Sequence, residues 1–151
     1  MGNVVVRPLE VSELGLVYRL DRRAFCDNCY PPFVLRQLYD VHGDLFQVAL
    51  MNDVLVGYVV GAVETVGSSA WILALTTDES YRNVGIATAM LTEIMGCIQK
   101  QQISSIKLTV AEDNVAAIHL YRDKFAFTIE RKVENYFGES TPRLLLQYNG
   151  I

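Results

Sequence analysis

The sequence predicts an α+β fold in which a mixed, mostly antiparallel sheet is flanked by helices, in the order β-α-α-β-β-β-α-β-α-β-β. Short runs of β-branched and apolar residues, bounded by turn residues, recur along the chain and are typical of strands. Residues 84–101 repeat their apolar side chains every three or four positions, which is the period of an amphipathic helix. Strand runs gather before this helix and alternate with helical runs after it, which favours the α+β layout.

The composition is that of a globular domain. The chain has 151 residues, of which 51% are hydrophobic and 20% are charged, and these values exclude intrinsic disorder. We expect one domain over residues 1–151 because this is an ordinary domain length. The apolar runs fall short of the roughly 20 residues of a membrane span, and no signal peptide begins the chain, so we expect a cytoplasmic protein with no membrane partner. A net charge of −4 without a basic block argues against nucleic acid as a partner.

Cys26 and Cys29 form a C-x-x-C pair, which in other proteins is a redox motif or half of a zinc site. Zinc normally takes four ligands, and the sequence has no second such pair and only two histidines, so we expect no metal site. We interpret the pair as free thiols between two helices, with redox or metal use as the alternative. With Cys97 the chain has three cysteines, and an odd number agrees with a reducing compartment.

The N-terminal part predicts one strand and two helices. Residues 3–7 are β-branched and form a strand that Pro8 stops. Ser12 is expected to cap a helix whose apolar side chains recur at helical spacing. The Tyr30-Pro31-Pro32 break ends this region, and a short second helix begins near Phe33.

The next part predicts three strands. Residues 46–51 and 54–60 flank Asn52-Asp53, a two-residue turn that indicates a hairpin. After a turn at Gly67-Ser68-Ser69, the continuous apolar run at 71–75 is typical of a central strand.

The last part alternates helices and strands. After the helix over 84–101, residues 103–110 alternate as a strand, and Asp113-Asn114 caps a helix that carries Tyr121 and Phe125. Two strands, at about 126–136 and 143–149, close the chain around a Gly138/Pro142 turn.

Chemistry is expected where the strand at 70–77 passes into the helix at 84–101. Gly85 and Ala87 are small enough for a bulky polyanion to approach the backbone closely. The first helical N–H groups have no partner within the helix and lie at the positive end of its dipole, and Arg82 adds a charge that pairs with phosphate. The segment lacks the Gly-Lys-Ser/Thr of a P-loop and the three glycines of a dinucleotide fingerprint. The junction therefore predicts a phosphate site of another kind.

The junction and the segments after it resemble the GCN5-related N-acetyltransferase (GNAT) superfamily, and the resemblance covers essentially the whole chain. Residues 82–87, Arg-Asn-Val-Gly-Ile-Ala, are similar to the R/Q-x-x-G-x-G/A pyrophosphate loop of that family. Residues 114–121 resemble its N-x-x-A-x-x-x-Y segment. Residues 124–127 resemble its K-x-G-F ending, with Ala126 where the family usually has Gly. Three motifs in register are much more specific than any one of them.

Two shorter segments are similar to the protein N-terminal acetyltransferases, the branch that includes the ribosomal-protein alanine acetyltransferase. Residues 30–33, Tyr-Pro-Pro-Phe, resemble the loop that lines the peptide slot in that branch. Residues 134–137, Glu-Asn-Tyr-Phe, resemble its Asn-Tyr-Tyr before the last hairpin. A proline turn and an aromatic strand end are the alternative interpretation. The resemblance implies acceptor contacts from four residues: Tyr30, Pro31, Phe33 and Tyr136.

The resemblance implies direct attack of an amine on the thioester of acetyl-CoA, which is the co-substrate. Tyr121 would protonate the departing CoA thiolate, because a phenol is an adequate proton donor, and a core aromatic is the alternative interpretation of this residue. The residues implied in acetyl-CoA binding are Leu75, Thr76 and Thr77 through their backbone, Arg82, Asn83, Val84, Gly85, Ile86, Ala87 and Thr88 around the pyrophosphate, and Asn114 beside the pantetheine arm.

The general base has no obvious candidate in this resemblance. Where N-terminal acetyltransferases often carry Glu or His this chain has Thr109, and where they sometimes carry Tyr it has Trp71. An α-amine, with a pKa of about 7.7–8.0, is partly neutral near pH 7, whereas a Lys amine, with a pKa near 10.4, is rarely neutral. The missing base therefore favours an α-amine acceptor that loses its proton through water, with Glu64 and Glu112 as candidate water-linked bases.

Three functions stay open on the sequence. The first is acetylation of the N-terminal amine of a peptide or protein. The second is acetylation of a small amine such as an amino acid, polyamine or aminoglycoside. The third is a catalytically weak acetyl-CoA-binding regulatory module, which Thr109 and Trp71 favour. The expected partner is the acceptor amine, and we expect a monomer or homodimer.

Overall fold

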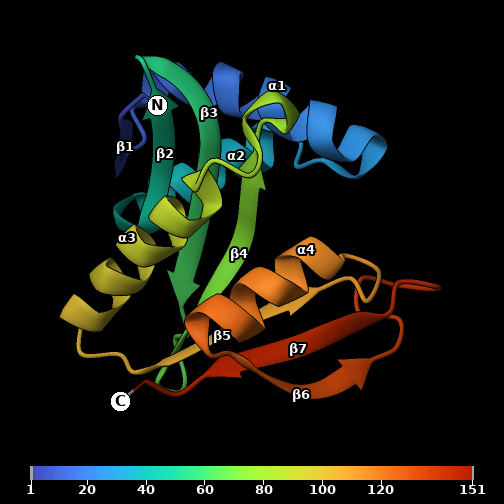
Figure 1. The fold of residues 1–151 in the computed structure, drawn as a ribbon. Helices are drawn as coiled ribbons and strands as arrows, with labels where there is room; N and C mark the ends of the chain where they lie inside the picture. The colour runs from blue at the N-terminus through green and yellow to red at the C-terminus, as the bar shows by residue number, and fades with distance from the viewer. Residues whose placement is uncertain (1, 151) are drawn as a thin grey trace.

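The computed structural model describes residues 2–150, in which seven strands form one mixed sheet flanked by helices (Figure 1). The sheet order is β1-β2-β3-β4-β5-β7-β6, and β4–β5 is its one parallel pair. The strands are β1 (Val4–Pro8), β2 (Phe46–Met51), β3 (Val54–Val63), β4 (Ser69–Thr77), β5 (Ser105–Val110), β6 (Thr128–Val133) and β7 (Arg143–Tyr148). The helices are α1 (Leu14–Phe25), α2 (Pro32–His42), α3 (Ile86–Lys100) and α4 (Val115–Ile118). The predicted α+β fold is confirmed.

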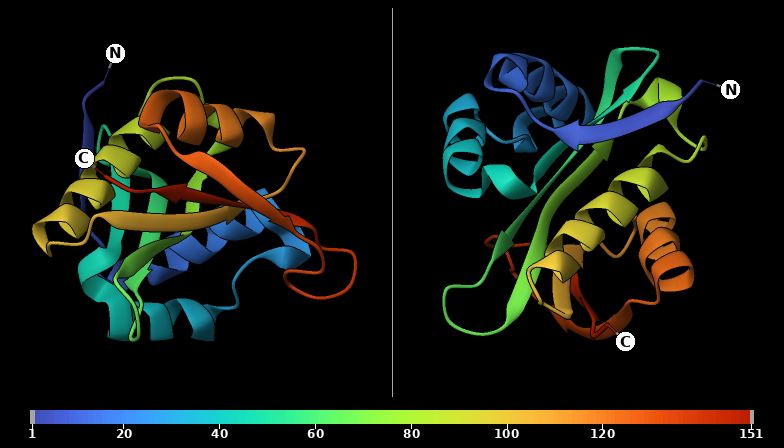
Figure 2. Two further views of the ribbon diagram at one scale, coloured as in Figure 1. Left: turned by 90° about the horizontal axis from the view of Figure 1, so that it is seen from below. Right: turned by 90° about the vertical axis from the view of Figure 1, so that its left-hand side faces the viewer.

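The helices cover both faces of the sheet. α1 and α2 lie on one face, and α3 and α4 lie on the other (Figure 2). Leu20 of α1 and Leu35 of α2 pack against Phe46 and Tyr58 of the sheet. The apolar stripe of α3 packs on the opposite face and is buried at Ile86, Met90, Leu91, Ile94, Met95 and Ile98. Across residues 2–150, no helix combines the length and the apolarity that crossing a bilayer requires.

The sheet opens between β4 and β5. These strands pair only at their first residues, where 69–71 lie against 105–107, and they then diverge (Figure 1). The pairing of β3 with β4 also shifts between Val60 and Gly61, and the shift leaves Leu73 as an extra, unpaired residue on β4. From Ile72 onward, the β4 backbone therefore has no ladder partner on its β5 side among the described strands. We call residues 72–77 the free edge of β4.

Local geometry confirms the predicted hairpin turn and shows that Ala126 adopts a backbone conformation that favours glycine. Asn52 and Asp53 both have positive φ, at 51° and 66°, as a two-residue hairpin turn between right-twisted strands requires. Ala126 has a φ of 60°, a conformation that Gly adopts at lower cost, so this position is strained by its side chain.

Several predicted boundaries are corrected. Ser12 does not cap α1, because the chain first makes a short 3-10 turn in which Glu10 and Glu13 form a reciprocal capping box. Glu13 is held there by Arg7, at 2.8 and 2.9 Å. Pro8 belongs to β1, and an edge strand tolerates a residue without an N–H.

Near the C-terminus, the helix after Asn114 is α-helical only over α4 and continues as a π-helical turn at His119–Lys124. The helix predicted over 84–101 runs from Ile86 to Lys100. The strand predicted at 126–136 spans only Thr128–Val133, because residues 134–137 form a turn instead.

Candidate functional site

The start of α3 has the geometry of an anion site. Gly85 is the N-cap residue with a φ of 88°, a left-handed conformation that favours glycine, and no side chain caps this helix. The Gly85 carbonyl accepts the N–H of Ala89, so the N–H groups of Ile86, Ala87 and Thr88 have no partner within the helix. A Cβ added at Gly85 would meet no protein atom within 4 Å. The backbone of this turn is therefore open to a ligand.

The side chains around this turn leave its backbone N–H groups accessible. Arg82, Asn83 and Val84 are exposed, and Asn83 also has a positive φ, at 64°. The Ile86 side chain is buried in the core, so this residue offers only its N–H group. Ala87 and Thr88 are half-buried in the first helical turn.

The free edge of β4 leads directly into this turn. Leu75 is half-buried and Thr76 is buried, so a ligand would meet mainly their backbone groups. The Thr77 hydroxyl oxygen is buried and has no hydrogen-bond partner within residues 2–150. An orphaned hydroxyl next to unpaired strand groups and free helix amides fits an elongated ligand with amide and phosphate groups, such as coenzyme A.

Asn114 lies at the start of α4 and has a structural role of its own. Its Oδ1 accepts the N–H of Ala117 at 3.2 Å, as the sequence predicts for a cap. This bond uses the side-chain oxygen and leaves the Nδ2 group free to donate. The predicted contact with the pantetheine arm is compatible with this arrangement.

Tyr121 lies in the π-helical turn and is 7% exposed. Its ring packs edge-on against Phe127, with the centroids 5.7 Å apart. Burial raises the pKa of Tyr121 to about 12, against the opposing effect of the Arg143 charge. The phenol is therefore neutral near physiological pH and can donate its O–H.

The phenols of Tyr30, Tyr121 and Tyr136 all act on the charge of Arg143. We call these four residues the acceptor cluster, after the acceptor contacts predicted for Tyr30 and Tyr136. Burial lowers the pKa of the Arg143 guanidinium, and the phenols of Tyr136, Tyr121 and Tyr30 oppose that shift. The Tyr30 hydroxyl donates to the carbonyl of Leu73, the extra residue of β4, at 3.4 Å. Tyr136 is 37% exposed and lies in the turn between β6 and β7. Two predicted acceptor residues, Tyr30 and Tyr136, thus share with Tyr121 the same neighbouring charge, that of Arg143.

The other two predicted acceptor residues lie at the start of α2. Pro31 is the N-cap residue of α2 and is exposed. Phe33 is 65% exposed and belongs to neither hydrophobic core. An acceptor contact at Phe33 stays a prediction.

Asp21 anchors the Tyr30 loop, and the sequence analysis did not single it out. This carboxylate is 1% exposed and accepts the Tyr58 hydroxyl at 2.6 Å and the Tyr30 N–H at 2.8 Å. Burial, followed by the charge of Asp21, raises the pKa of Tyr58. The two bonds fix the loop to β3. The sequence offers only one hint of this role, a single Asp in the middle of a helix. It does not show that the Asp is buried, because burial depends on tertiary packing.

Replacing Tyr58 with Phe is expected to lower the free energy of unfolding by about 1–3 kcal/mol, because the buried Asp21 carboxylate loses a donor. The KM for the acceptor should rise as well, since the Tyr30 loop loses part of its anchor. Thermal unfolding and steady-state kinetics measure the two effects. Tyr18→Phe in α1 is the matched control, because the Tyr18 hydroxyl makes only an exposed bond at 3.5 Å. Equal stability of the two variants would contradict the anchoring role.

The positions of the family's usual bases hold no free base. The Thr109 hydroxyl accepts Arg143 Nε at 3.3 Å. Trp71 Nε1 donates to Glu64 at 2.7 Å, and this bond, with help from Lys107, lowers the pKa of Glu64. Glu64 is therefore a weaker base than an ordinary carboxylate.

Glu112, the other candidate water-linked base, is ion-paired with Lys132 at 2.9 Å.

The sequence analysis did not single out Arg143. It is the first residue of the last strand, directly after Pro142, a placement that is equally typical of a surface charge.

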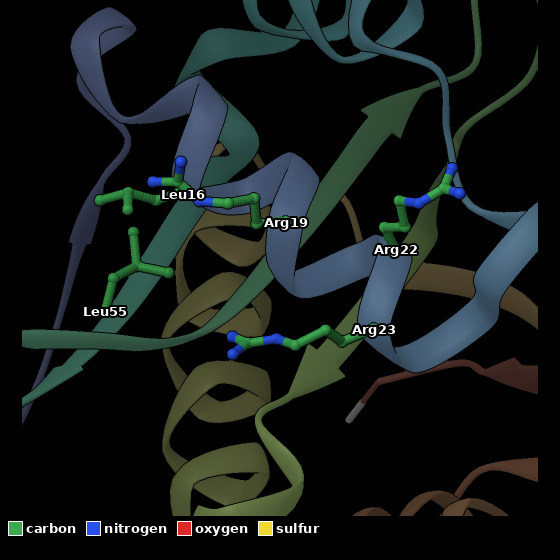
Figure 3. A pocket seen from close by; sticks show the side chains of 5 residues that line it. All are labelled: Leu16, Arg19, Arg22, Arg23 and Leu55. Atoms are coloured by element: carbon green, nitrogen blue, oxygen red, sulfur yellow. The ribbon is translucent and has the colours of Figure 1, made fainter.

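A concavity of about 460 Å³ lies beside α1, and its lining side chains are drawn in Figure 3. It is lined by Leu16, Arg19, Arg22 and Arg23 of α1 and by Leu55 of β3. Arg23 also pairs with Asp78, at 3.2 Å, in the loop before α3. The concavity contains none of the predicted site residues.

Comparison with known proteins identifies the family of this chain and several relatives. The profile described as Acetyltransferase (GNAT) family matches residues 15–127. An N-alpha-acetyltransferase of Sulfolobus acidocaldarius is 23% identical over 155 residues, covering 95% of this chain and 91% of the relative. N-alpha-acetyltransferase 50 of Danio rerio is 32% identical over 103 residues, covering 66% of this chain and 61% of the relative.

Two solved structures show the same fold. The crystal structure of Ard1 from Thermoplasma volcanium has a TM-score of 0.89 at 24% identity and covers 98% of each chain. Arabidopsis thaliana Naa50, in complex with the bisubstrate analogue CoA-Ac-MVNAL, has a TM-score of 0.80 at 24% identity, covering 95% of this chain and 97% of the other.

Proposed function

Since this chain belongs to the GNAT family and is an acetyl-CoA-dependent N-acetyltransferase, we propose that its acceptor is the N-terminal α-amine of a peptide or protein. The observation that carries the proposal is the absence of a free base at Thr109 and Trp71, both of which are engaged in hydrogen bonds. An acceptor of this site must supply a neutral amine largely by itself, and an α-amine does so far better than a Lys side chain. The names of the relatives support the same acceptor.

In this family, acetyl-CoA supplies the thioester whose acetyl group the acceptor amine takes by direct attack. Arg82 and the free N–H groups at the start of α3, those of Ile86, Ala87 and Thr88, are proposed to hold its pyrophosphate. The free edge of β4 is proposed to hold the pantetheine arm through backbone groups. Unpaired strand amides there can also stabilise negative charge that develops on the acetyl oxygen. Asn114 is proposed to donate its free Nδ2 group to the arm.

Tyr121 is the proposed proton donor to the departing sulfur. Its burial keeps the phenol neutral, so the O–H is available near pH 7. Tyr30 and Tyr136 are proposed to contact the first residues of the peptide, because they belong to two different loops and both act, as Tyr121 does, on the charge of Arg143. The proton that the amine loses leaves through water.

The release of CoA with a panel of acceptors tests this function. The panel contains peptides with a free N-terminus, the same peptides blocked at the N-terminus, and small amines such as polyamines and aminoglycosides. We expect turnover on free peptides and none on blocked ones. Turnover on small amines alone would overturn the peptide acceptor. Tight acetyl-CoA binding without turnover on any acceptor would instead assign the chain a regulatory binding role.

The pH profile follows from the same groups. We expect kcat/KM to rise with one apparent pKa near the 7.7–8.0 of the α-amine and to stay level up to about pH 10. No falling limb is expected in this range, because Tyr121 keeps its proton up to about pH 12. Its raised pKa also means that the stability gained from the neutral buried phenol is lost as the pH rises through the window from 10 to about 12. Initial rates at saturating acetyl-CoA measure the profile, and a falling limb below pH 9 would assign proton donation to another group.

A further inference from the structure

Arg143 brings a partly dehydrated positive charge into the acceptor cluster. It begins β7, and its guanidinium lies against Thr109 of β5, with Nε 3.3 Å from the hydroxyl oxygen and Nη2 3.0 Å from the backbone carbonyl oxygen. Its Cζ atom lies 5.1 Å from the centroid of the Phe137 ring. Half-burial lowers the pKa of Arg143, and the neighbouring Tyr136, Tyr121 and Tyr30 phenols oppose that shift.

No carboxylate of the described chain compensates this charge. Other cations have one: Arg7 pairs with Glu13, Arg23 with Asp78 and Lys132 with Glu112. The sequence has 17 acidic residues against 13 Lys and Arg, so acidic partners are not scarce. None of those in residues 2–150 lies within ion-pair distance of Arg143. A half-buried cation without an opposite charge nearby costs free energy unless a bound ligand supplies that charge.

The guanidinium also has donors to spare. It carries five N–H groups, of which two are used on Thr109, so three have no partner in the described structure. The Nε side faces Thr109, and the fork formed by Nη1 and Nη2 is the edge that takes a carboxylate in a bidentate manner. The same group acts electrostatically on Tyr121, Tyr30 and Tyr136, so a carboxylate bound to it would lie near the proposed proton donor and the proposed acceptor contacts.

We propose that Arg143 binds a carboxylate of the acceptor, and that the preferred acceptors are amines carrying an acidic group close to the amine. The carboxylate can come from an Asp or Glu side chain at the first or second position of a peptide, or from the α-carboxyl group of a free amino acid. In its peptide form, this inference rests on the proposed function above. Arg143 is then a specificity-determining residue as well as a brace between β5 and β7.

Matched acceptors test the inference on the intact enzyme. We compare kcat/KM for peptides that begin Met-Glu and Met-Gln, for peptides that begin Glu and Gln, and for methionine and methioninamide. Because a hydrogen-bonded ion pair is worth more than a neutral contact, we expect the acidic member to be preferred by about tenfold or more in at least one pair. Arg143→Gln should reduce that preference to within about twofold. Arg36→Gln on α2, which removes an exposed cation paired with Asp40, should keep it.

Two further variants separate recognition from bracing. Arg143→Lys keeps the charge and should keep part of the preference. Arg143→Glu should reverse it, so that a Met-Lys peptide becomes a better substrate than a Met-Glu peptide. Loss of a brace alone would lower all rates together and would not reverse the order. Thermal unfolding and acetyl-CoA affinity of each variant show whether the fold is retained.

Each outcome decides one of the two proposals. Equal rates on acidic and amide acceptors in the native enzyme overturn the carboxylate inference and leave the peptide function standing. Turnover of methionine over methioninamide, without turnover of any peptide, overturns the peptide function and supports the carboxylate inference. A preference that persists in Arg143→Gln places carboxylate recognition elsewhere and overturns the role of Arg143.

Discussion

Replacing Tyr121 with Phe is expected to lower kcat by about a hundredfold while acetyl-CoA affinity stays within about twofold. A positioned proton donor contributes about a hundredfold to ten-thousandfold, and a thiolate leaves more readily than an alkoxide or amine, so the lower end applies. The ring itself should stay in place, because its packing against Phe127 does not use the hydroxyl. Steady-state kinetics and equilibrium binding of acetyl-CoA measure the two quantities.

Tyr148→Phe is the matched control for this change. Tyr148 packs on the same Phe127 ring, with centroids 5.5 Å apart, but it belongs to β7 and lies outside the acceptor cluster. Its variant should retain nearly full kcat. An unchanged kcat in Tyr121→Phe would refute proton donation and leave Tyr121 as a core aromatic. A similar loss in both variants would indicate that packing around Phe127, and not the Tyr121 hydroxyl, limits the rate.

Gly85→Ala is expected to raise the dissociation constant of acetyl-CoA by about tenfold or more. The Cβ meets no protein atom, so it extends into the space where the pyrophosphate is proposed to lie and keeps it from the α3 amides. The left-handed φ of 88° also disfavours Ala, so the free energy of unfolding should fall by about 1–2 kcal/mol. Isothermal titration calorimetry and thermal unfolding measure the two effects.

Gly96→Ala, in the interior of the same helix, is the control. A Cβ at Gly96 also meets nothing within 4 Å, and Gly96 is not among the glycines with positive φ. This variant should gain about 0.5–1 kcal/mol of stability and bind acetyl-CoA as the native protein does. If both variants bind acetyl-CoA with native affinity, the pyrophosphate is not held at the turn around Gly85.

The helix start that is proposed to bind the cofactor could be predicted from sequence because its determinants are local. The helical period of residues 84–101 and the small residue Gly85 predict a helix start whose backbone a polyanion can approach. In the structure, Gly85 is the N-cap residue in a left-handed conformation. The hairpin at Asn52-Asp53 follows from turn chemistry in the same way. The cap of α1 could not be predicted so readily. Ser12 is a good capping residue, but Glu13 is drawn into a capping box and is also held by Arg7 of a neighbouring strand.

The proposed acceptor side depends on contacts between distant segments. Arg143 reaches Thr109 only because β7 pairs with β5 in the observed register, where Leu144 lies opposite Val110. Asp21 is buried because α1 lies over Tyr58 of β3. The free edge of β4 arises from the divergence of two strands whose sequences read as ordinary strands. Local patterns do not specify such placements, so the residues proposed to distinguish one acceptor from another emerge only in the folded protein.

The position acetylated on a peptide with both a free α-amine and an internal Lys tests the central claim most directly. After reaction with acetyl-CoA near pH 7, tandem mass spectrometry locates the acetyl group. At this pH the neutral fraction of an α-amine exceeds that of a Lys amine by more than about a hundredfold. The positions of Thr109 and Trp71 hold no base that could deprotonate a Lys amine and so offset the difference. We therefore expect the acetyl group on the α-amine. Acetylation at the Lys Nζ would contradict the account.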